Sequence, residues 1–144
     1  MSGAATESMN DADLAALAAR DRFMSLLGAE LVEAGPGTAT VRALVKPEHL
    51  NFNGTCHGGF TFALADIAFG IASNSHGEAA AGIDAHVAFT AAAYQDDELT
   101  ATAREVSRTR RVGTYAIDVV RAGGRNVARF TGTVYISGGA DIRR

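Results

Sequence analysis

The sequence has little of three things that would each direct it to a particular class of protein: cysteine, net charge and long apolar runs. Its single cysteine, Cys56, excludes an internal disulfide and is too few for a cysteine-based zinc site. Thirteen basic and sixteen acidic residues give a formal charge of -3, so no global field attracts nucleic acid or anionic lipid. No apolar run reaches the ~20 residues of a membrane span, and the first residues lack the pattern of a signal peptide. We expect a cytoplasmic protein with no nucleic-acid or membrane partner.

The chain does contain enough apolar material for one core. It has 144 residues, of which 47% are hydrophobic and 20% are charged, as in an ordinary globular domain. We therefore expect residues 1–144 to form a single domain. Residues 1–10 resemble a flexible tail, and a helix is predicted over 11–27, capped by Asn10 or Asp11 and closed by Gly28.

Two periodicities organise the middle of the chain. Residues 37–46 alternate with a period of two and predict a strand, which follows a short strand near 31–33 and ends at Pro47. A helix is predicted over about 58–75. Its apolar residues surround the helix axis, so we expect it to be buried, although Asp66 lies in its middle.

Four strands are expected after this helix, because alternating segments are separated by turn residues. They cover 81–93, 98–107, 111–122 and 125–137, and the last two are close enough for a β-hairpin. Short connections predict antiparallel neighbours. The order favours an α+β fold in which an antiparallel sheet wraps around the buried helix. The outer side of that helix then needs cover from the first helix or from another subunit.

Asp66 and the pair Gly58-Gly59 are the first candidates for chemistry. The free N–H groups and the dipole at the start of a helix favour an oxyanion or a polarised carbonyl, although Gly-Gly is also a plain turn. A carboxylate within an apolar helix is rare unless it is paired or functional. Asp66 is therefore either the partner of an arginine or serine on a strand, or a general base or nucleophile.

Helix geometry limits how these groups act together. Asp66 follows Gly58 by eight residues, or about 12 Å along the axis, which is too far for both to act on one carbonyl. Two copies related by a two-fold axis would bring Gly58 of one subunit to Asp66 of the other. Function would then require a homodimer.

The other polar candidates have alternative interpretations. Asn51 could orient water or a substrate carbonyl, or form a turn. Cys56 and His57 suggest a nucleophile with its base, but adjacent side chains of an extended segment point to opposite sides. The basic cluster 107–111 is either a solvated strand end or a phosphate site, since guanidinium groups match phosphate oxygens. The remaining histidines show no ligand spacing, so no metal site is expected.

Together, these residues resemble the signature of the PaaI-type hotdog-fold acyl-CoA thioesterases, over about residues 26–136. The resemblance implies a hotdog fold, with five or six antiparallel strands wrapped around a central helix, paired into a homodimer and commonly into a homotetramer. The residues that match the signature in the helix region are Asn51, His57-Gly58-Gly59, Phe62, Leu64-Ala65-Asp66, Ala68-Phe69 and Asn74-Ser75.

The resemblance also implies an enzyme that hydrolyses acyl-CoA to the free acid and CoA, with no other cofactor. Phenylacetyl, hydroxyphenylacetyl or medium-chain acyl groups are the expected substrates. Gly58, with Gly59, is expected to polarise the thioester carbonyl, and Asp66 of the opposite subunit to activate water or attack directly. Asn51 is expected to position the reacting groups, and His57 to order the turn.

The remaining expectations concern the substrate. Phe62 would line an acyl pocket or belong to the core, and Arg108 and Arg111 would bind the substrate. Some relatives carry a small hydroxyl residue near Asp84; if Asp84 faces the site, two carboxylates share it.

Two other functions use similar residues. A hotdog dehydratase or hydratase would need an acid–base pair, for which His57 and Asp66 are candidates, although the His-Gly-Gly context is more similar to thioesterases. A non-catalytic acyl-CoA-binding module would need an output domain.

Overall fold

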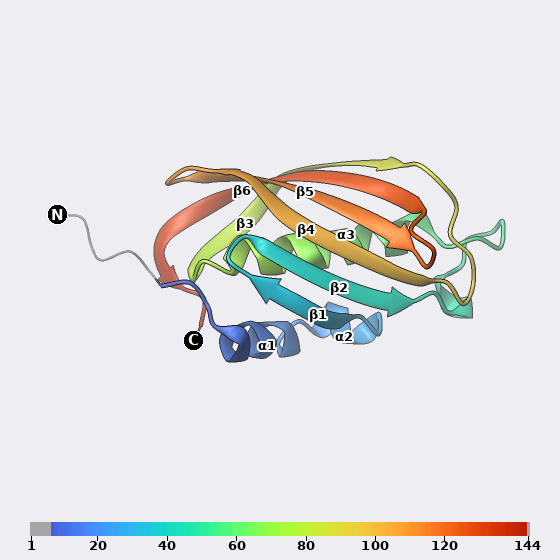
Figure 1. The fold of residues 1–144 in the computed structure, drawn as a ribbon, viewed down its shortest axis with the longest axis horizontal. Coiled ribbons are helices and arrows are strands. Elements are labelled where there is room, and N and C mark those ends of the chain that lie inside the picture. Colours follow the sequence, from blue (N-terminus) through green and yellow to red (C-terminus); the bar gives the residue numbers. More distant parts are fainter. Residues whose placement is uncertain (1–6, 144) are drawn as a thin grey trace.

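The computed structural model describes residues 7–143 and consists of a six-stranded sheet with one long helix packed on it (Figure 1). The helices are α1 (Asp11–Ala19), α2 (Arg22–Leu26) and α3 (Gly58–Asn74), with a 3-10 turn at Pro47–His49. The strands are β1 (Glu30–Gly35), β2 (Thr38–Leu44), β3 (Glu78–Phe89), β4 (Glu98–Arg108), β5 (Val112–Arg121) and β6 (Asn126–Asp141).

The sheet has the order β1-β2-β4-β5-β6-β3, and all neighbouring strands are antiparallel. The sheet curves around α3, with α1 and α2 beside β1 (Figure 1). This confirms the predicted α+β hotdog architecture. The hairpin between β5 and β6 is also present, with Gly123 and Gly124 at positive φ (94° and 89°).

One expected adjacency is wrong, because β3 pairs with β6 at the edge of the sheet and not with β4. The strand predicted over 81–93 ends early, at Phe89. The next residues leave the sheet and pass the start of α3, where the Ala93 carbonyl accepts a hydrogen bond from the Cys56 N–H at 2.8 Å. Residues 90–97 therefore form a crossover to β4.

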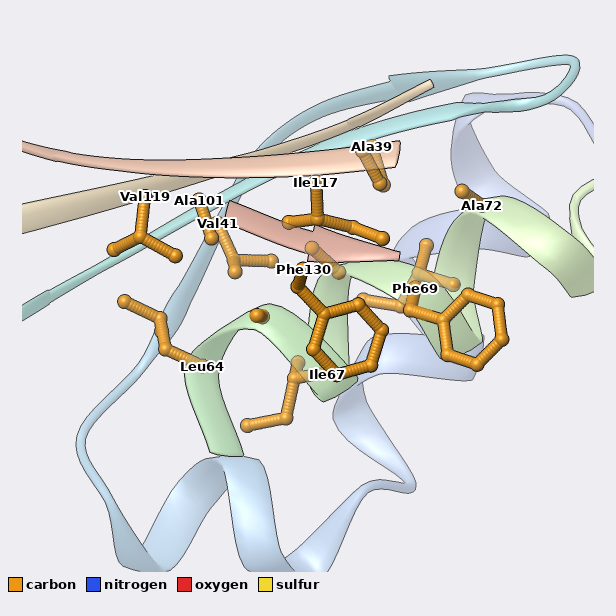
Figure 2. Close-up of a cluster of buried hydrophobic side chains, with 14 of the residues drawn as sticks. Ala39, Val41, Leu64, Ile67, Phe69, Ala72, Ala101, Ile117, Val119 and Phe130 are labelled. Atoms are coloured by element: carbon orange, nitrogen blue, oxygen red, sulfur yellow. The ribbon is translucent and has the colours of Figure 1, made fainter. Parts of the chain in front are cut away.

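Alternate residues of the inner strands β2, β4, β5 and β6 face α3 and form the core. Figure 2 shows side chains of α3, such as Leu64 and Phe69, in one layer with Ile117 and Phe130 from the sheet. Burial of one such side chain contributes about 1.5–3 kcal/mol. The inward-facing residues predicted for the last two strands are buried: Tyr115, Ile117, Val119, Ala128, Phe130, Val134 and Ile136.

Phe69 brings α3 close to the sheet at two glycines. A Cβ atom on Gly132 would lie 2.7 Å from the Phe69 ring, and one on Gly82 would lie 3.1 Å from it. The ring also packs against Tyr115 and Phe130, at centroid distances of 5.7 and 5.5 Å. The two glycines therefore provide the space that this ring occupies.

The C-terminal end of α3 is fixed by side-chain hydrogen bonds. Asn74 joins the helix to β3, since its Oδ1 accepts from the Ala80 N–H at 2.9 Å and its Nδ2 donates to the Ala80 carbonyl at 3.1 Å. Ser75 Oγ accepts from the Gly37 N–H at 2.8 Å, in the turn between β1 and β2. Gly77, at φ 91°, then reverses the chain into β3, as the stop signal predicted.

The helix predicted over 11–27 is wrong in one respect, because the structure has two helices there. Asp21 lies between them with extended backbone (φ -80°, ψ 98°). Its Oδ1 accepts a hydrogen bond from the Met24 N–H at 2.9 Å, which starts a second helix. Asn10 caps α1 as predicted, and Gly28, at φ 71°, follows α2.

The tail predicted over 1–10 lies partly outside the described residues, which begin at residue 7. Within them, Met9 is 5% exposed, and its N–H donates to the Ser75 carbonyl at 2.8 Å. The tail prediction is wrong at this position, because the apolar side chain joins the core beside the end of α3.

The contact of Phe69 with the sheet gives a test of the fold. Gly132→Ala is expected to lower the free energy of unfolding by about 1–3 kcal/mol, because its methyl group would overlap the buried ring. Gly35→Ala is the matched control, since its Cβ would meet only Thr38 Oγ1 at an ordinary 3.6 Å. Urea unfolding measures both variants. Equal stabilities would contradict the close packing at Gly132.

Candidate active site

The start of α3 is built around His57, the N-cap of the helix. Its Nδ1 accepts a hydrogen bond from the Gly59 N–H at 2.8 Å. The sequence analysis expected this N–H to bind the substrate together with Gly58, but in this chain it is already used by the cap. The Gly58 N–H makes no hydrogen bond to any of residues 7–143. It lies at the positive end of the helix dipole and can therefore polarise a carbonyl.

Gly58 opens onto a groove between the start of α3 and the segment after β3. This Gly58 groove has a volume of about 480 Å³ and is lined by Cys56, Gly58, Thr61, Phe89 and residues 90–93, with Val127. A Cβ on Gly58 would lie 3.1 Å from the Phe89 ring, so glycine keeps the approach to the Gly58 N–H open.

The Cys56 thiol lies in the same groove, with its Sγ 3.7 Å from Thr61 Oγ1, and burial raises the pKa of the thiol. The thiol makes no contact with the His57 ring that would activate it.

Asp66 lies on the side of α3 that faces away from the sheet. The sequence analysis expected the helix to be buried, but in a single chain one side of it remains open. Gly59 and Asp66 are exposed there, and Ala63 and Gly70 are partly exposed. Asp66 makes no hydrogen bond or ion pair with any of residues 7–143, so the structural interpretation of a strand partner finds no support within the chain.

Asp66 lines a second groove, between α3 and the α1–α2 segment. Although exposed, its carboxylate lies between the walls of this groove and loses part of its hydration, which raises its pKa; the charge of Asp21 raises the pKa further. The groove has a volume of about 480 Å³. The residues of this Asp66 groove are Leu17, Arg20, Asp21, Phe23, Asp66, Ile67, Gly70, Ile71, Asn74 and Ile142.

The Gly58 groove and the Asp66 groove share no residue. A single chain therefore presents its free N–H and its carboxylate to different spaces, as the axial separation along α3 predicted. A smaller groove of about 240 Å³ lies along the same side of α3, where His57, Gly59 and Ala63 meet Phe23 of α2. Phe23 is thus common to this groove and to the Asp66 groove.

Asn51 is used by its own loop. Its Oδ1 accepts from the Asn53 N–H at 2.9 Å and from the Thr55 N–H at 3.2 Å, and its Nδ2 donates to Thr55 Oγ1 at 3.0 Å. Asn51 therefore fixes the turn that leads to His57 and lines neither groove. Phe62 also lies outside both grooves, because its ring packs against Phe130 at 5.2 Å, on the core side of the helix.

Two arginines of the basic cluster, Arg108 and Arg111, differ in their surroundings. Arg108 Nη2 donates to Glu78 Oε1 at 3.2 Å, and both side chains are about three-quarters buried (24% and 26% exposed). Arg111 is exposed, and its Nη1 donates to the Ser137 carbonyl at 3.3 Å. Arg108, which was predicted to bind substrate, thus has an internal partner in Glu78, whereas Arg111 has an exposed guanidinium.

Arg108 belongs to a polar cluster that the sequence did not reveal. Glu105 Oε1 accepts from the Tyr115 hydroxyl and lies against His76 Nε2, each at 2.8 Å. Burial by itself raises the pKa of Glu105, but the bonds from Tyr115 and His76 and the charges of His76 and Arg108 outweigh it and lower the pKa. This cluster lies at the C-terminal end of α3, far from Gly58.

Asp84 lies on the outer face of the sheet. It pairs with Thr133, which alternates with the buried Gly132 and Val134, so its side chain points away from α3. The second carboxylate near Asp66 is instead Asp21, which the sequence analysis missed. An aspartate three residues before Met24 is a sequence signal for the N-cap of α2. This signal does not indicate that the Asp21 side chain also lines the Asp66 groove.

No three histidine, cysteine, aspartate or glutamate side chains of residues 7–143 gather as a metal site requires. Within the same residues, none of the helices has the length and hydropathy to cross a bilayer.

Comparisons with known proteins agree with this geometry. The model of the family described as thioesterase superfamily matches residues 53–128. Acyl-coenzyme A thioesterase PaaI of Escherichia coli K12 is 35% identical over 83% of this chain and 85% of that protein. The E. coli PaaI structure superposes with a TM-score of 0.84, over 87% of this chain and 91% of that one.

Two further solved structures are similar. The TT0310 protein of Thermus thermophilus is 42% identical, with a TM-score of 0.79 over 81% of this chain and 98% of that one. A hypothetical thioesterase protein of Streptococcus pneumoniae, solved with coenzyme A, is 27% identical, with a TM-score of 0.75 over 78% of this chain and 91% of that one. The similar proteins thus favour hydrolysis over the dehydratase and binding-module interpretations.

The two arginines give a matched test of the basic cluster. Arg108→Met is expected to lower the free energy of unfolding by about 1–3 kcal/mol, because it leaves Glu78 partly buried and unpaired. Arg111→Met should change it by less than about 0.5 kcal/mol, since Arg111 is exposed. Urea unfolding at neutral pH compares them. If Arg108→Met were as stable as the unmodified protein, the ion pair would not be a structural element.

Proposed function

The chain belongs to the thioesterase superfamily as a PaaI-type hotdog thioester hydrolase, and on that premise we propose that it hydrolyses acyl-CoA in active sites shared by two chains. The observation that carries the proposal is the separation of the two chemical groups. Gly58 and Asp66 line different grooves of one chain, so a complete site needs Gly58 of one subunit and Asp66 of another.

The free edge of β3 supports a homodimer. The strand has 12 residues and, among residues 7–143, pairs on one side only, with β6. Its exposed residues include Ile83, at 62%, and Phe89, at 56%. Such a long, apolar and unpaired edge favours pairing with a second copy about a two-fold axis. Exposed apolar side chains on the outer face of the sheet, Leu44 and Tyr135, support association of two dimers into a homotetramer.

The proposed reaction uses the groups that the structure leaves free. The Gly58 N–H donates to the thioester carbonyl oxygen and stabilises the negative charge that develops there. Asp66 of the other subunit takes a proton from water as the water oxygen attacks the carbonyl carbon. Alternatively, Asp66 attacks that carbon itself, and water then hydrolyses the resulting anhydride, which releases the acid and restores the carboxylate. In both routes the carbon–sulfur bond breaks, and CoA leaves as a thiolate, which needs no metal or other cofactor. His57 and Asn51 act by holding the turn that presents Gly58.

The Asp66 groove is the proposed acyl site. Leu17, Phe23, Ile67 and Ile71 give it apolar walls beside the carboxylate, and its volume suits a phenylacetyl, hydroxyphenylacetyl or medium-chain acyl group. Arg111 offers an exposed guanidinium for a CoA phosphate, whereas Arg108 supports the strand end. The cytoplasm is the expected compartment.

Complementation between two inactive variants tests the shared site. Gly58→Pro removes one N–H at the first helical position, where proline is tolerated and where His57 already has a compatible extended backbone. It is expected to lower kcat by about 10²–10³-fold. Asp66→Asn is expected to abolish hydrolysis while leaving the protein folded. Co-expressed with different tags and purified through both, the two variants should recover up to about half of the normal turnover, because one of two sites per dimer is intact.

Gly58→Ala is the matched control, since it adds a side chain beside Phe89 but keeps the N–H. If the doubly tagged protein had no activity, Gly58 and Asp66 would act within one chain or not at all, and the shared-site proposal would be wrong. Near-normal turnover by Asp66→Asn alone would remove Asp66 from the mechanism.

A free-thiol assay with acetyl-, octanoyl-, phenylacetyl-, hydroxyphenylacetyl- and benzoyl-CoA tests the acyl site. Phe23→Ala is expected to raise KM for the large acyl groups by roughly tenfold, the effect of ~1.4 kcal/mol of lost apolar contact, and to leave KM for acetyl-CoA nearly unchanged. Leu26→Ala is the control, because Leu26 lies on the same helix, is 77% exposed and lines none of the three grooves. Equal effects of Phe23→Ala on all esters would place the acyl group elsewhere.

A further inference from the structure

The Asp66 groove contains a second carboxylate. Its charged side chains are Arg20, Asp21 and Asp66; α3 supplies only Asp66, and the α1–α2 segment supplies the other two. Near the C-terminus, Ile142 also lines the groove. The neighbouring Arg143 forms an ion pair with Asp13, with 3.8 Å between Nη1 and Oδ2. Two acidic groups therefore share one space of about 480 Å³ with a single cation.

The cation in the groove does not pair with either carboxylate. Arg20 Nη1 donates to the Ile142 carbonyl at 3.0 Å, and no ion pair joins Arg20 to Asp21 or Asp66. The negative charges of Asp21 and Asp66 are therefore not neutralised by a bound partner among residues 7–143. Their mutual repulsion acts across the groove.

Asp21 is held in place by its own hydrogen bond. Its Oδ1 accepts from the Met24 N–H at 2.9 Å, and its backbone is extended, so the carboxylate is fixed at the start of α2. Asp21 is also half-buried, and salt screens a partly buried charge less than a fully exposed one. The α1–α2 break, which interrupts an otherwise helical segment, thus places a charged group opposite Asp66.

We propose that Asp21 is a positioning residue of the hydrolase: across the groove, its charge adds to the basicity of Asp66 and moves the acid limit of hydrolysis to higher pH. This proposal rests on the role of Asp66 proposed above. Burial of Asp66 acts in the same direction and is the larger effect, with Asp21 adding to it. A stronger base accepts the proton of water more readily, provided that it is ionised at the working pH.

The Asp21→Asn variant separates the effect of the Asp21 charge from the effect of its N-cap hydrogen bond. Asn is as good an N-cap as Asp, so Asp21→Asn keeps the bond to Met24 and removes the charge. In Asp21→Asn, Asp66 should lose its proton at lower pH. The acid limb of the kcat/KM profile is therefore expected to move to lower pH. The ratio of variant to unmodified kcat/KM should exceed one on the acid limb and fall to one or below on the plateau.

Asp11→Asn is the matched control, because it removes a carboxylate from the first turn of α1 that lies outside the groove. Its pH profile should coincide with that of the unmodified protein. Asp21→Ser is a second variant that keeps a capping oxygen without the charge, and it should shift the limb as Asp21→Asn does. An unshifted limb in both Asp21 variants, with folded protein by circular dichroism, would overturn the proposal.

Carbon-13 NMR titration of the Asp66 side-chain carboxyl provides a readout that does not depend on turnover. It should show the Asp66 carboxyl titrating at lower pH in Asp21→Asn than in the unmodified protein. If Asp66→Asn kept its activity while this titration moved, the proposed function of Asp66 would fail and the coupling would stand. If the titration did not move, the coupling would be wrong whatever the activity of the enzyme.

Discussion

The packing of α3 against the curved sheet is the constraint on which the rest of the structure depends. Phe69 occupies the space that side chains at Gly82 and Gly132 would fill, and this brings the helix axis close to the strands. Asn74 and Ser75 then fix the C-terminal end of the helix to β3 and to the turn before β2. With the helix fixed along its length, its N-terminus and its open side have defined positions, and both carry the candidate chemistry.

A rigid helix also explains why the site is incomplete in one chain. Gly58 presents its free N–H at the start of α3, and Asp66 presents its carboxylate about two turns later, in another groove. No rearrangement of side chains can bring them to one carbonyl without bending the helix. The unpaired edge of β3 offers the alternative, because a second subunit that pairs there would bring its own α3 helix to the site. The assembly of the site and the assembly of the oligomer are therefore proposed to be the same event.

The sequence predicted what depends on local periodicity and missed what depends on tertiary contact. The helix after His57, the alternation in the strands and the stop at Gly77 follow from apolar spacing and glycine, and they agree with the structure. The pairing of β3 with β6 does not follow from spacing, because a crossover of eight residues resembles a loop between neighbours. The positions of Arg108 and Asp21 could not be predicted either, since their partners, Glu78 and the Asp66 groove, are distant in sequence.

The place of Asp66 on the helix explains how an apolar helix tolerates a carboxylate. Its neighbours Ala65 and Ile67 are 0% and 6% exposed, so a carboxylate at either position would lose nearly all its hydration, at a cost of several kcal/mol. Asp66 points to the groove instead and loses only part of its hydration. A second subunit that closed this groove would remove more water. The same closure would strengthen Asp66 as a base and the attraction of the Gly58 N–H for a developing oxyanion, because both depend on the local dielectric.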